Sequence, residues 1–283
     1  MKRHTVYVVL GLFLAVALVA LAAPASAEMF VEGYLGGTAA ANMGQNFVVH
    51  DSAPATRVVT SSDFHLNYPG TTDCVLGGVK LGTWFVKEGF AGWSGYPDWC
   101  KYFGFYTDFS YQRLEMRGQG LSGVNYYGGL LKNADGAVIG SFQNIANVAG
   151  TISSEGMVAT WAFMFAGRYG FFPDSAVPFG RLQPYVAVGP AVMFTTMNPK
   201  LQANGLSMSP GGETEAVIAL AVESGIRYMA TKNVSIDLSF KYRYAQPSFS
   251  FSGINGVNGG PASFKLDPVY QLFSGQLGVA YHF

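Results

Sequence analysis

Apolar and polar residues alternate with a period of two along 214–244, on both sides of a short turn at 231–233. Before the turn, one face carries Ala216, Ile218, Leu220, Val222, Ile226 and Tyr228, and only Ser224 interrupts it. After the turn, one face carries Val234, Ile236, Leu238, Phe240, Tyr242 and Tyr244. A helix would spread these residues around its axis. The pattern therefore predicts two antiparallel strands, each with one apolar face.

The same alternation recurs along the rest of the chain, at 29–38, 75–85, 103–113, 157–169, 185–195 and 269–283. Together with the first pair, these segments give eight strands of about 10 to 15 residues, which suits strands that cross a membrane at a tilt. An open sheet would leave unpaired backbone groups in lipid, so the first and last strands must pair. The predicted fold is all-β: an eight-stranded antiparallel up-and-down transmembrane β-barrel in contact with outer-membrane lipids.

The N-terminal segment predicts export. Basic residues at 2–4 precede an apolar run at 6–21, and the small residues Ala25, Ser26 and Ala27 follow it. This order is typical of a secretory signal peptide at 1–27, which leaves 28–283 as one barrel domain. Any further membrane span must then be built from strands, which favours the outer membrane of a Gram-negative bacterium.

The lengths of the connections predict the orientation of the barrel. An even number of strands puts both termini on the periplasmic side, with short turns there and long loops outside the cell. The connections at 39–73, 114–156, 196–214 and 247–268 are longer than those at 86–100, 170–183 and 231–233. Within the second long loop, 130–139 contains an Asp-Gly turn between apolar residues and forms either an extramembrane hairpin or two additional barrel strands.

Three segments carry a resemblance to a known family: 183–192, the strand-turn-strand at 221–244, and the closing segment 276–283. They resemble the bacterial outer-membrane β-barrel family of OmpA-like and opacity-like proteins. The resemblance implies an architecture and no particular chemistry. It also implies that Phe283, with Tyr281 behind it, forms the terminal signal read by the barrel assembly machinery.

Charged residues on the polar faces form the candidate site. Five acids and five bases fall at inward positions: Glu32, Asp108, Glu215, Glu223 and Asp237, with Lys80, Arg168, Arg227, Lys241 and Arg243. An unpaired buried charge is costly, so a lumen as narrow as that of eight strands should pair them. A three-residue turn with Asn233 in the left-handed conformation would place Arg227 opposite Asp237, and Glu223 opposite Lys241. The main interpretation is a salt-bridged plug; the alternatives are a polar channel and a cavity for one small ligand.

Composition adds little chemistry. Seventeen basic and seventeen acidic residues balance, so nothing attracts nucleic acid. No metal-ligand spacing, phosphate-binding glycine loop or Cys-x-x-Cys motif is present, so no cofactor is expected. His50 and His65 fall in the first long loop and are interpreted as solvated. His282 is inward and has no nearby serine in an elbow motif, so we expect no enzyme; a lipid A-modifying enzyme is a distant alternative.

Cys74 and Cys100 are the only cysteines. The predicted topology puts them at opposite ends of the barrel, about 30 Å apart by the rise of a strand. A disulfide needs Cα atoms within about 7 Å, so we expect two free thiols. A cluster of aromatic residues near Cys100 is interpreted as part of an interfacial girdle; it comprises Phe90, Trp93, Tyr96 and Trp99.

Two classes of function follow. The first is a scaffold that presents loops outside the cell, with 39–73 and 114–156 as the expected contact with an extracellular partner. The second is a narrow channel or transporter for small or hydrophobic solutes, for which these loops would act as lids.

Overall fold

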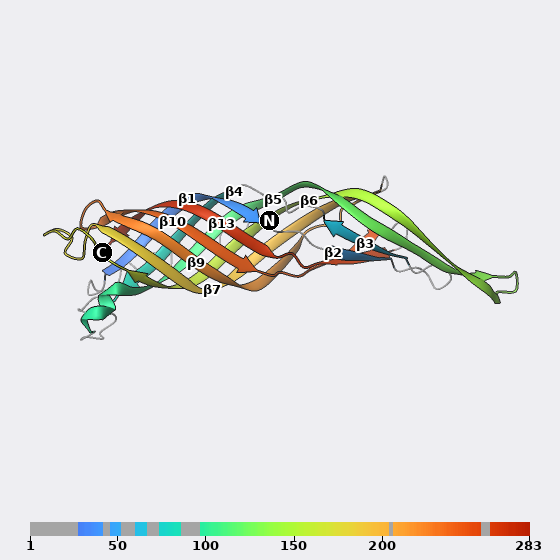
Figure 1. The fold of residues 1–283 in the computed structure, drawn as a ribbon, viewed down its shortest axis with the longest axis horizontal. Coiled ribbons are helices and arrows are strands. Elements are labelled where there is room, and N and C mark those ends of the chain that lie inside the picture. Colours follow the sequence, from blue (N-terminus) through green and yellow to red (C-terminus); the bar gives the residue numbers. More distant parts are fainter. Residues whose placement is uncertain are drawn as a thin grey trace.

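The computed structural model describes residues 28–41, 46–51, 60–66, 74–85, 97–203, 206–255 and 261–283. The predicted signal peptide at 1–27 lies outside this part of the chain. Eight long strands wind around a common axis, and two of them project far beyond the rest (Figure 1). These eight are β1 (Glu28–Ala41), β4 (Cys74–Trp84), β5 (Phe103–Lys132), β6 (Val138–Arg168), β7 (Leu182–Ala203), β9 (Glu213–Met229), β10 (Val234–Ala245) and β13 (Tyr270–His282).

The eight strands close into a ring. Each pairs antiparallel with the next in chain order, and β13 pairs with β1 along twelve residues, from Phe30 opposite His282 to Ala41 opposite Gln271. Closure removes the free edges that an open sheet would expose to lipid. The predicted eight-stranded barrel is therefore confirmed, and 130–139 adds no strand to its ring.

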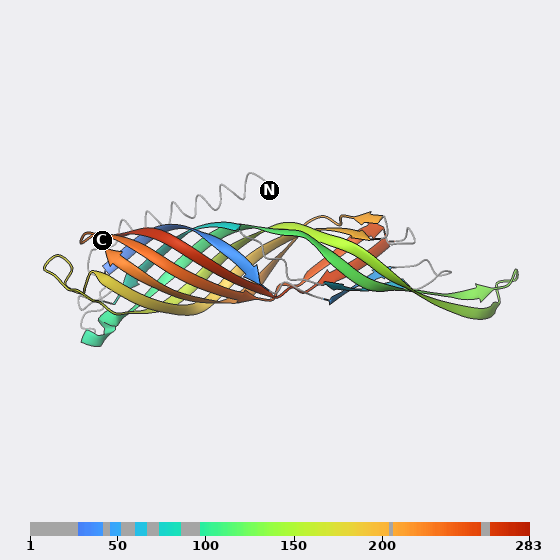
Figure 2. The same ribbon diagram turned by 45° about the horizontal axis from the view of Figure 1, so that its top comes forward.

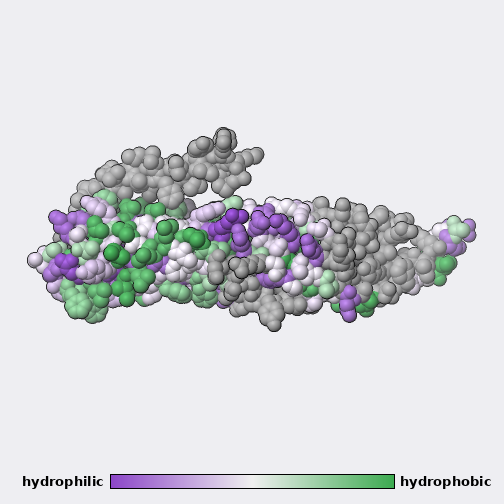
Figure 3. Space-filling model, turned by 90° about the horizontal axis from the view of Figure 1, so that it is seen from above, coloured by the Kyte–Doolittle hydropathy of each residue, from purple (hydrophilic) through white to green (hydrophobic). Residues whose placement is uncertain are grey.

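Alternation decides which side chains face out. On β9, Ile218 is 80% exposed while Glu223 is fully buried, because neighbouring residues of a strand point to opposite faces. The space-filling view shows apolar side chains gathered over the barrel part of the molecule (Figure 3). Among the described residues, no helix is long and apolar enough to cross a membrane.

We call the end of the barrel that holds Glu28 and Phe283 the terminal end, and the opposite end the hairpin end. From the hairpin end, β5 and β6 continue as a single antiparallel ladder to a turn at 133–137 (Figure 2). The strand ends predicted at 113 and 157 are wrong, since the two strands have 30 and 31 residues. The segment 130–139 is the tip of this hairpin, outside the barrel, as the first of the two interpretations expected.

The other long connections also contain strands. These are β2 (Asn46–Asp51), β3 (Thr60–Leu66), β8 (Leu206–Met208), β11 (Phe249–Asn255) and β12 (Pro261–Leu266). Four of them extend the sheet beside the projecting part of β5, in the order β11-β12-β2-β3-β5. The connections at 39–73 and 247–268, predicted as long loops, instead contribute these strands to a small sheet. It has an aromatic core, with the rings of Phe251 and Phe264 stacked 4.9 Å apart.

Connections at the terminal end are compact. A 3-10 helix, η1 (Asp98–Tyr102), leads into β5 and buries Cys100, while Cys74 begins β4 at the hairpin end. Both cysteines are free, as the topology predicted. Trp99, of the predicted aromatic cluster, is 61% exposed in η1; Phe90, Trp93 and Tyr96 lie outside the described residues.

Candidate functional site

Buried charges occupy the middle of the barrel. We call seven residues the charged cluster, each at most 3% exposed: Glu32, Lys80, Asp108, Glu223, Arg227, Asp237 and Lys241. They sit on β1, β4, β5, β9 and β10, because the inward positions of these strands meet at one level of the lumen. Glycines make room for them. A Cβ on Gly278 would lie 2.8 Å from Glu32 Oε1, and a Cβ on Gly78 would lie 2.3 Å from the Tyr34 hydroxyl.

Lys80 is the centre of the charged cluster. Its Nζ donates hydrogen bonds of 2.7 Å to Glu32 Oε1 and to Glu223 Oε1, and lies 3.9 Å from Asp237 Oδ1. The ammonium also lies 5.0 Å from the centre of the Tyr34 ring. Three carboxylates and an aromatic face thus replace the water that a lysine would otherwise keep.

Arg227 is the second base of the charged cluster and contacts two of its acids. Its Nη2 donates to Glu32 Oε2 at 2.8 Å, and its Nε lies 3.4 Å from Asp237 Oδ2. The Tyr185 hydroxyl is within hydrogen-bonding distance of Glu223 (2.7 Å) and Asp237 (2.8 Å). Each carboxylate therefore has more than one partner, as a buried charge requires.

Lys241 extends the cluster towards the hairpin end. Its Nζ donates to Asp108 and lies 3.0 Å from Glu223 Oε2. The other oxygen of Asp108 accepts a 2.6 Å hydrogen bond from the Tyr34 hydroxyl. Charges of both signs thus alternate along a continuous path through the lumen.

The register of the β9–β10 hairpin is the one that the turn length predicted. Arg227 pairs with Asp237, and Glu223 with Lys241. The conformation expected of Asn233 is wrong, since Phe172 is the only described non-glycine residue with a positive φ. Asn233 instead donates from Nδ2 to the His282 carbonyl at 2.7 Å, which fixes the turn against β13.

Several of these contacts join opposite walls. Three strands separate β4 from β9 in either direction around the ring, and three also separate β5 from β10. The pair Lys80–Glu223 spans the first diameter, and the pair Lys241–Asp108 spans the second. Each pair therefore bridges the lumen at the height of the charged cluster.

Arg243 lies one layer nearer the hairpin end and is held by neutral groups. Its Nη2 donates to Gln112 Oε1 at 2.8 Å and to Ser274 Oγ at 2.9 Å, and its Nη1 lies 3.3 Å from the hydroxyls of Ser110 and Thr160. Gln112 is on β5, opposite β10, so this layer too is bridged across the lumen.

Arg168 lies at the terminal end and has a partner that the sequence interpretation missed. Its guanidinium donates to both oxygens of Glu28, at 2.7 and 2.5 Å. Glu215, assigned to the network from its position on β9, is instead half-buried beyond the cluster, opposite Thr195. Alternation gives the face of a strand on which a residue lies but not its height, so it could not show that Glu215 lies beyond the cluster.

His282 contacts a serine after all. Its Nε2 lies 2.9 Å from Ser235 Oγ, and its Nδ1 lies 3.6 Å from Glu28 Oε1. The order resembles a nucleophile, a base and an acid, but Ser235 is fully buried and Glu28 is bound by Arg168. The contacts therefore tie β10, β13 and β1 together. Among the described residues, no group of three or more His, Cys, Asp or Glu is placed to hold a metal.

The two residues of the predicted assembly signal lie at the terminal end. Tyr281 and Phe283 are 51% and 41% exposed, and their rings meet edge to face at 5.2 Å. The Phe283 amide donates to the Met29 carbonyl at 2.9 Å, which closes the seam between the first and last strands.

A closed antiparallel ring with an apolar exterior and a charged interior is the reverse of a soluble protein. Lipid satisfies the outer faces, while hydrogen bonds between strands satisfy the backbone. The chain is an eight-stranded β-barrel of the bacterial outer membrane.

The similarity of this chain to known proteins is distant. The sequence matches no protein-family model and no curated protein. Among solved structures, it is similar to Neisserial surface protein A, with 12% identity, a TM-score of 0.35 and coverage of 90% of this chain and 97% of that chain. The chain is also similar to OprG from Pseudomonas aeruginosa, with 14% identity, a TM-score of 0.40 and coverage of 91% of this chain and 97% of that chain. A third similar structure is Ail of Yersinia pestis, in complex with the heparin analogue sucrose octasulfate. Here the identity is 13%, the TM-score is 0.36, and the coverage is 90% of this chain and 99% of that chain.

Proposed function

We propose that this protein is a non-conducting scaffold of the outer membrane, closed by its charged cluster, that presents the hairpin-end structure outside the cell. The observation that carries the proposal is the pair of contacts across two diameters, Lys80–Glu223 and Lys241–Asp108. A channel of eight strands would need its central side chains to lie against the wall. Here they meet in the middle, where the three bases of the charged cluster offset three of its four acids.

The hairpin-end structure supports a role in surface contact. The small sheet packs around its own buried apolar residues, such as Phe249, Phe251 and Leu266, so it is held in one shape rather than left as flexible loops. At the tip of the long hairpin, Val138 and Ile139 are 56% and 68% exposed. Exposed apolar residues on a projecting strand pair are suited to contact with an extracellular protein partner.

Conductance tests the closed lumen. The refolded protein, inserted into a planar lipid bilayer, is expected to give no sustained openings. Sustained large openings would refute the plug and favour the channel or transporter.

Trimming the hairpin tests the surface role. Gly128 pairs with Gln143, so joining them through an Asn-Gly turn in place of 129–142 shortens the hairpin and leaves the β3–β5 pairing intact. We expect a folded barrel that no longer supports adhesion of whole cells. The double substitution V138S/I139S should weaken adhesion partly, and unchanged adhesion in both variants would contradict the role of the hairpin.

We also propose that Phe283 and Tyr281 act in assembly by the barrel assembly machinery. Their exposed rings at the seam of the barrel support this role. Phe283→Ala should slow insertion in cells more than refolding in detergent, and equal slowing in both would indicate an anchoring role alone.

A further inference from the structure

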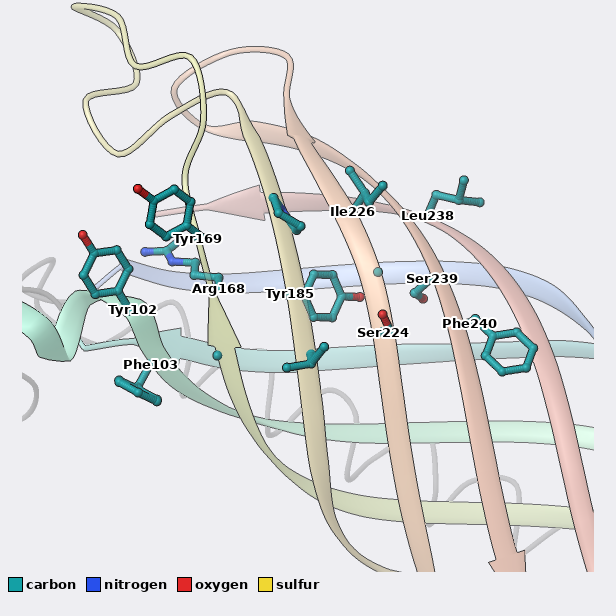
Figure 4. Close-up of a pocket in the computed structure, with 14 residues that line it drawn as sticks. Tyr102, Phe103, Arg168, Tyr169, Tyr185, Ser224, Ile226, Leu238, Ser239 and Phe240 are labelled. Atoms are coloured by element: carbon teal, nitrogen blue, oxygen red, sulfur yellow. The ribbon is translucent and has the colours of Figure 1, made fainter.

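A groove of about 710 Å³ lies on the outer wall of the barrel, near the terminal end (Figure 4). Its floor is formed where outward positions carry small or flat residues: Gly167 on β6, Pro184 on β7 and Ser224 on β9. Larger outward residues form its rims, among them Phe103, Val186, Ile226, Leu238 and Phe240. Gly167 points outward because Arg168, next to it, faces the lumen.

This groove faces lipid, so it is filled by lipid or by nothing. A void beside an apolar wall forfeits dispersion contacts on one side. A methylene chain is the only part of a bilayer that is narrow enough to follow such a groove and apolar enough to match its rims. Ser224, the one residue that interrupts the apolar face of its strand, removes the side chain that would otherwise fill the floor.

One end of the groove is polar. The rings of Tyr102 and Tyr169 stack there, 5.7 Å apart and nearly parallel at 6°. Figure 4 shows both hydroxyl groups on the side away from Phe240. The exposed Lys101 places its ammonium 5.3 Å from the centre of the Tyr102 ring. A cation beside two phenol groups matches a phosphate at the depth of the headgroups.

We propose that this groove is a binding site for one glycerophospholipid, with an acyl chain between the rims and the phosphate near Lys101, Tyr102 and Tyr169. The site lies at the terminal end, so with the orientation proposed above the lipid belongs to the inner leaflet. It is separated from the lumen by the barrel wall and is independent of whether the lumen conducts.

Filling the groove is the first test. A Cβ on Gly167 would have its nearest neighbours at 4.0 Å, so Gly167→Leu puts a side chain into the groove without a backbone clash. The matched control is Gly33→Leu, because Gly33 is also outward, with nothing within 4 Å, but lies on β1, away from the groove. Ser224→Leu is the second filling variant, used if Gly167→Leu does not show the heat-modifiable migration of a folded barrel.

The measurement is native mass spectrometry of protein released from nanodiscs of phosphatidylethanolamine and phosphatidylglycerol. The wild type and Gly33→Leu should each retain one phospholipid, and Gly167→Leu should retain it at least about tenfold less. Lys101→Gln should lower retention of phosphatidylglycerol about fivefold, whereas Lys232→Gln, an exposed lysine in a turn at the same end, should not.

Equal retention by the wild type and Gly167→Leu would overturn the proposal, because the bound lipid would then be annular. So would preferential retention of lipopolysaccharide in mixed membranes, since that lipid belongs to the outer leaflet. None of these variants should change conductance, so failure of the lipid site and failure of the plug give different results.

Discussion

Removing the charge of Lys80 tests the reasoning about the lumen most directly. Lys80→Met keeps a long, unbranched side chain of similar reach but deletes the ammonium. Glu32 and Glu223 then each lose a 2.7 Å hydrogen bond, and Asp237 loses a cation at 3.9 Å. The charged cluster holds four acids and three bases, so its formal charge changes from −1 to −2.

The expected loss in the free energy of unfolding is large for a single substitution. At an effective dielectric constant of about 20, each 2.7 Å pair contributes roughly 6 kcal/mol of attraction. Desolvation of the ions opposes most of that gain, and removal of one partner from a buried pair typically costs about 3–5 kcal/mol. We therefore expect the free energy of unfolding to fall by about 3–5 kcal/mol, a substantial fraction of the total stability of an ordinary domain.

Urea unfolding in lipid vesicles, followed by tryptophan fluorescence, measures this change. The control is Lys232→Met, in the exposed turn between β9 and β10, which should shift stability by less than about 0.5 kcal/mol. Glu223→Gln completes a double-mutant cycle, and the double variant K80M/E223Q should be more stable than the sum of the two single losses predicts. If K80M costs less than about 1 kcal/mol and the cycle shows no coupling, the charged cluster does not hold the walls together.

Three further predictions concern other parts of the molecule. Gly225→Ala should destabilise the barrel by about 1–3 kcal/mol in urea, because a Cβ there lies 2.7 Å from the Tyr185 ring; Gly33→Ala, with open space, should cost less. Phe251→Ala should cost about 3–5 kcal/mol of local stability, seen as faster amide exchange across β11 and β12 with the barrel unchanged. The backbone amide of Val177, together with Arg181, lowers the pKa of Asp174, so the turn gains stability above the ordinary carboxyl pKa of about 4 and loses it as pH falls through the lowered value. Exchange of the Val177 amide, corrected for its intrinsic rate, should therefore rise below about pH 4 in the wild type and show no such dependence in Asp174→Asn.

The eight strands could be predicted because a membrane barrel imposes one rule on every strand. Lipid requires apolar residues at alternate positions, and the lumen accepts polar residues between them, so the period of two survives without any tertiary information. The short turn at 231–233 then fixed which residues of β9 and β10 face each other. Local geometry was sufficient for both results.

The ends of β5 and β6 could not be predicted in the same way. Leu114 and Ile152 lie beyond the predicted strand ends, yet they are buried at inward positions of the same two strands. Apolar and polar residues continue to alternate there because the small sheet covers one face of β5 and β6. The pattern therefore does not indicate where the membrane-spanning part of these strands ends. Glu28 was missed for a different reason. It directly follows the expected signal-peptide cleavage site and precedes the first predicted strand, so it was not counted among the inward charges.

The packing of the lumen around its glycines also supports the proposed plug. Glycine faces the lumen at Gly78, Gly225 and Gly278, positions that would widen a water-filled passage. In the structure this space is taken by other side chains: the Tyr34 hydroxyl against Gly78, the Tyr185 ring against Gly225, and the Glu32 carboxylate against Gly278. Moving the charged pairs aside would therefore not open a path, because the wall has no room to receive them. A solute could pass only if Tyr34 and Tyr185 also left their places, and both tyrosines are hydrogen-bonded to the acids of the charged cluster. These contacts support a closed lumen, and under the proposed function the protein meets its partners on its outer wall and at its two ends.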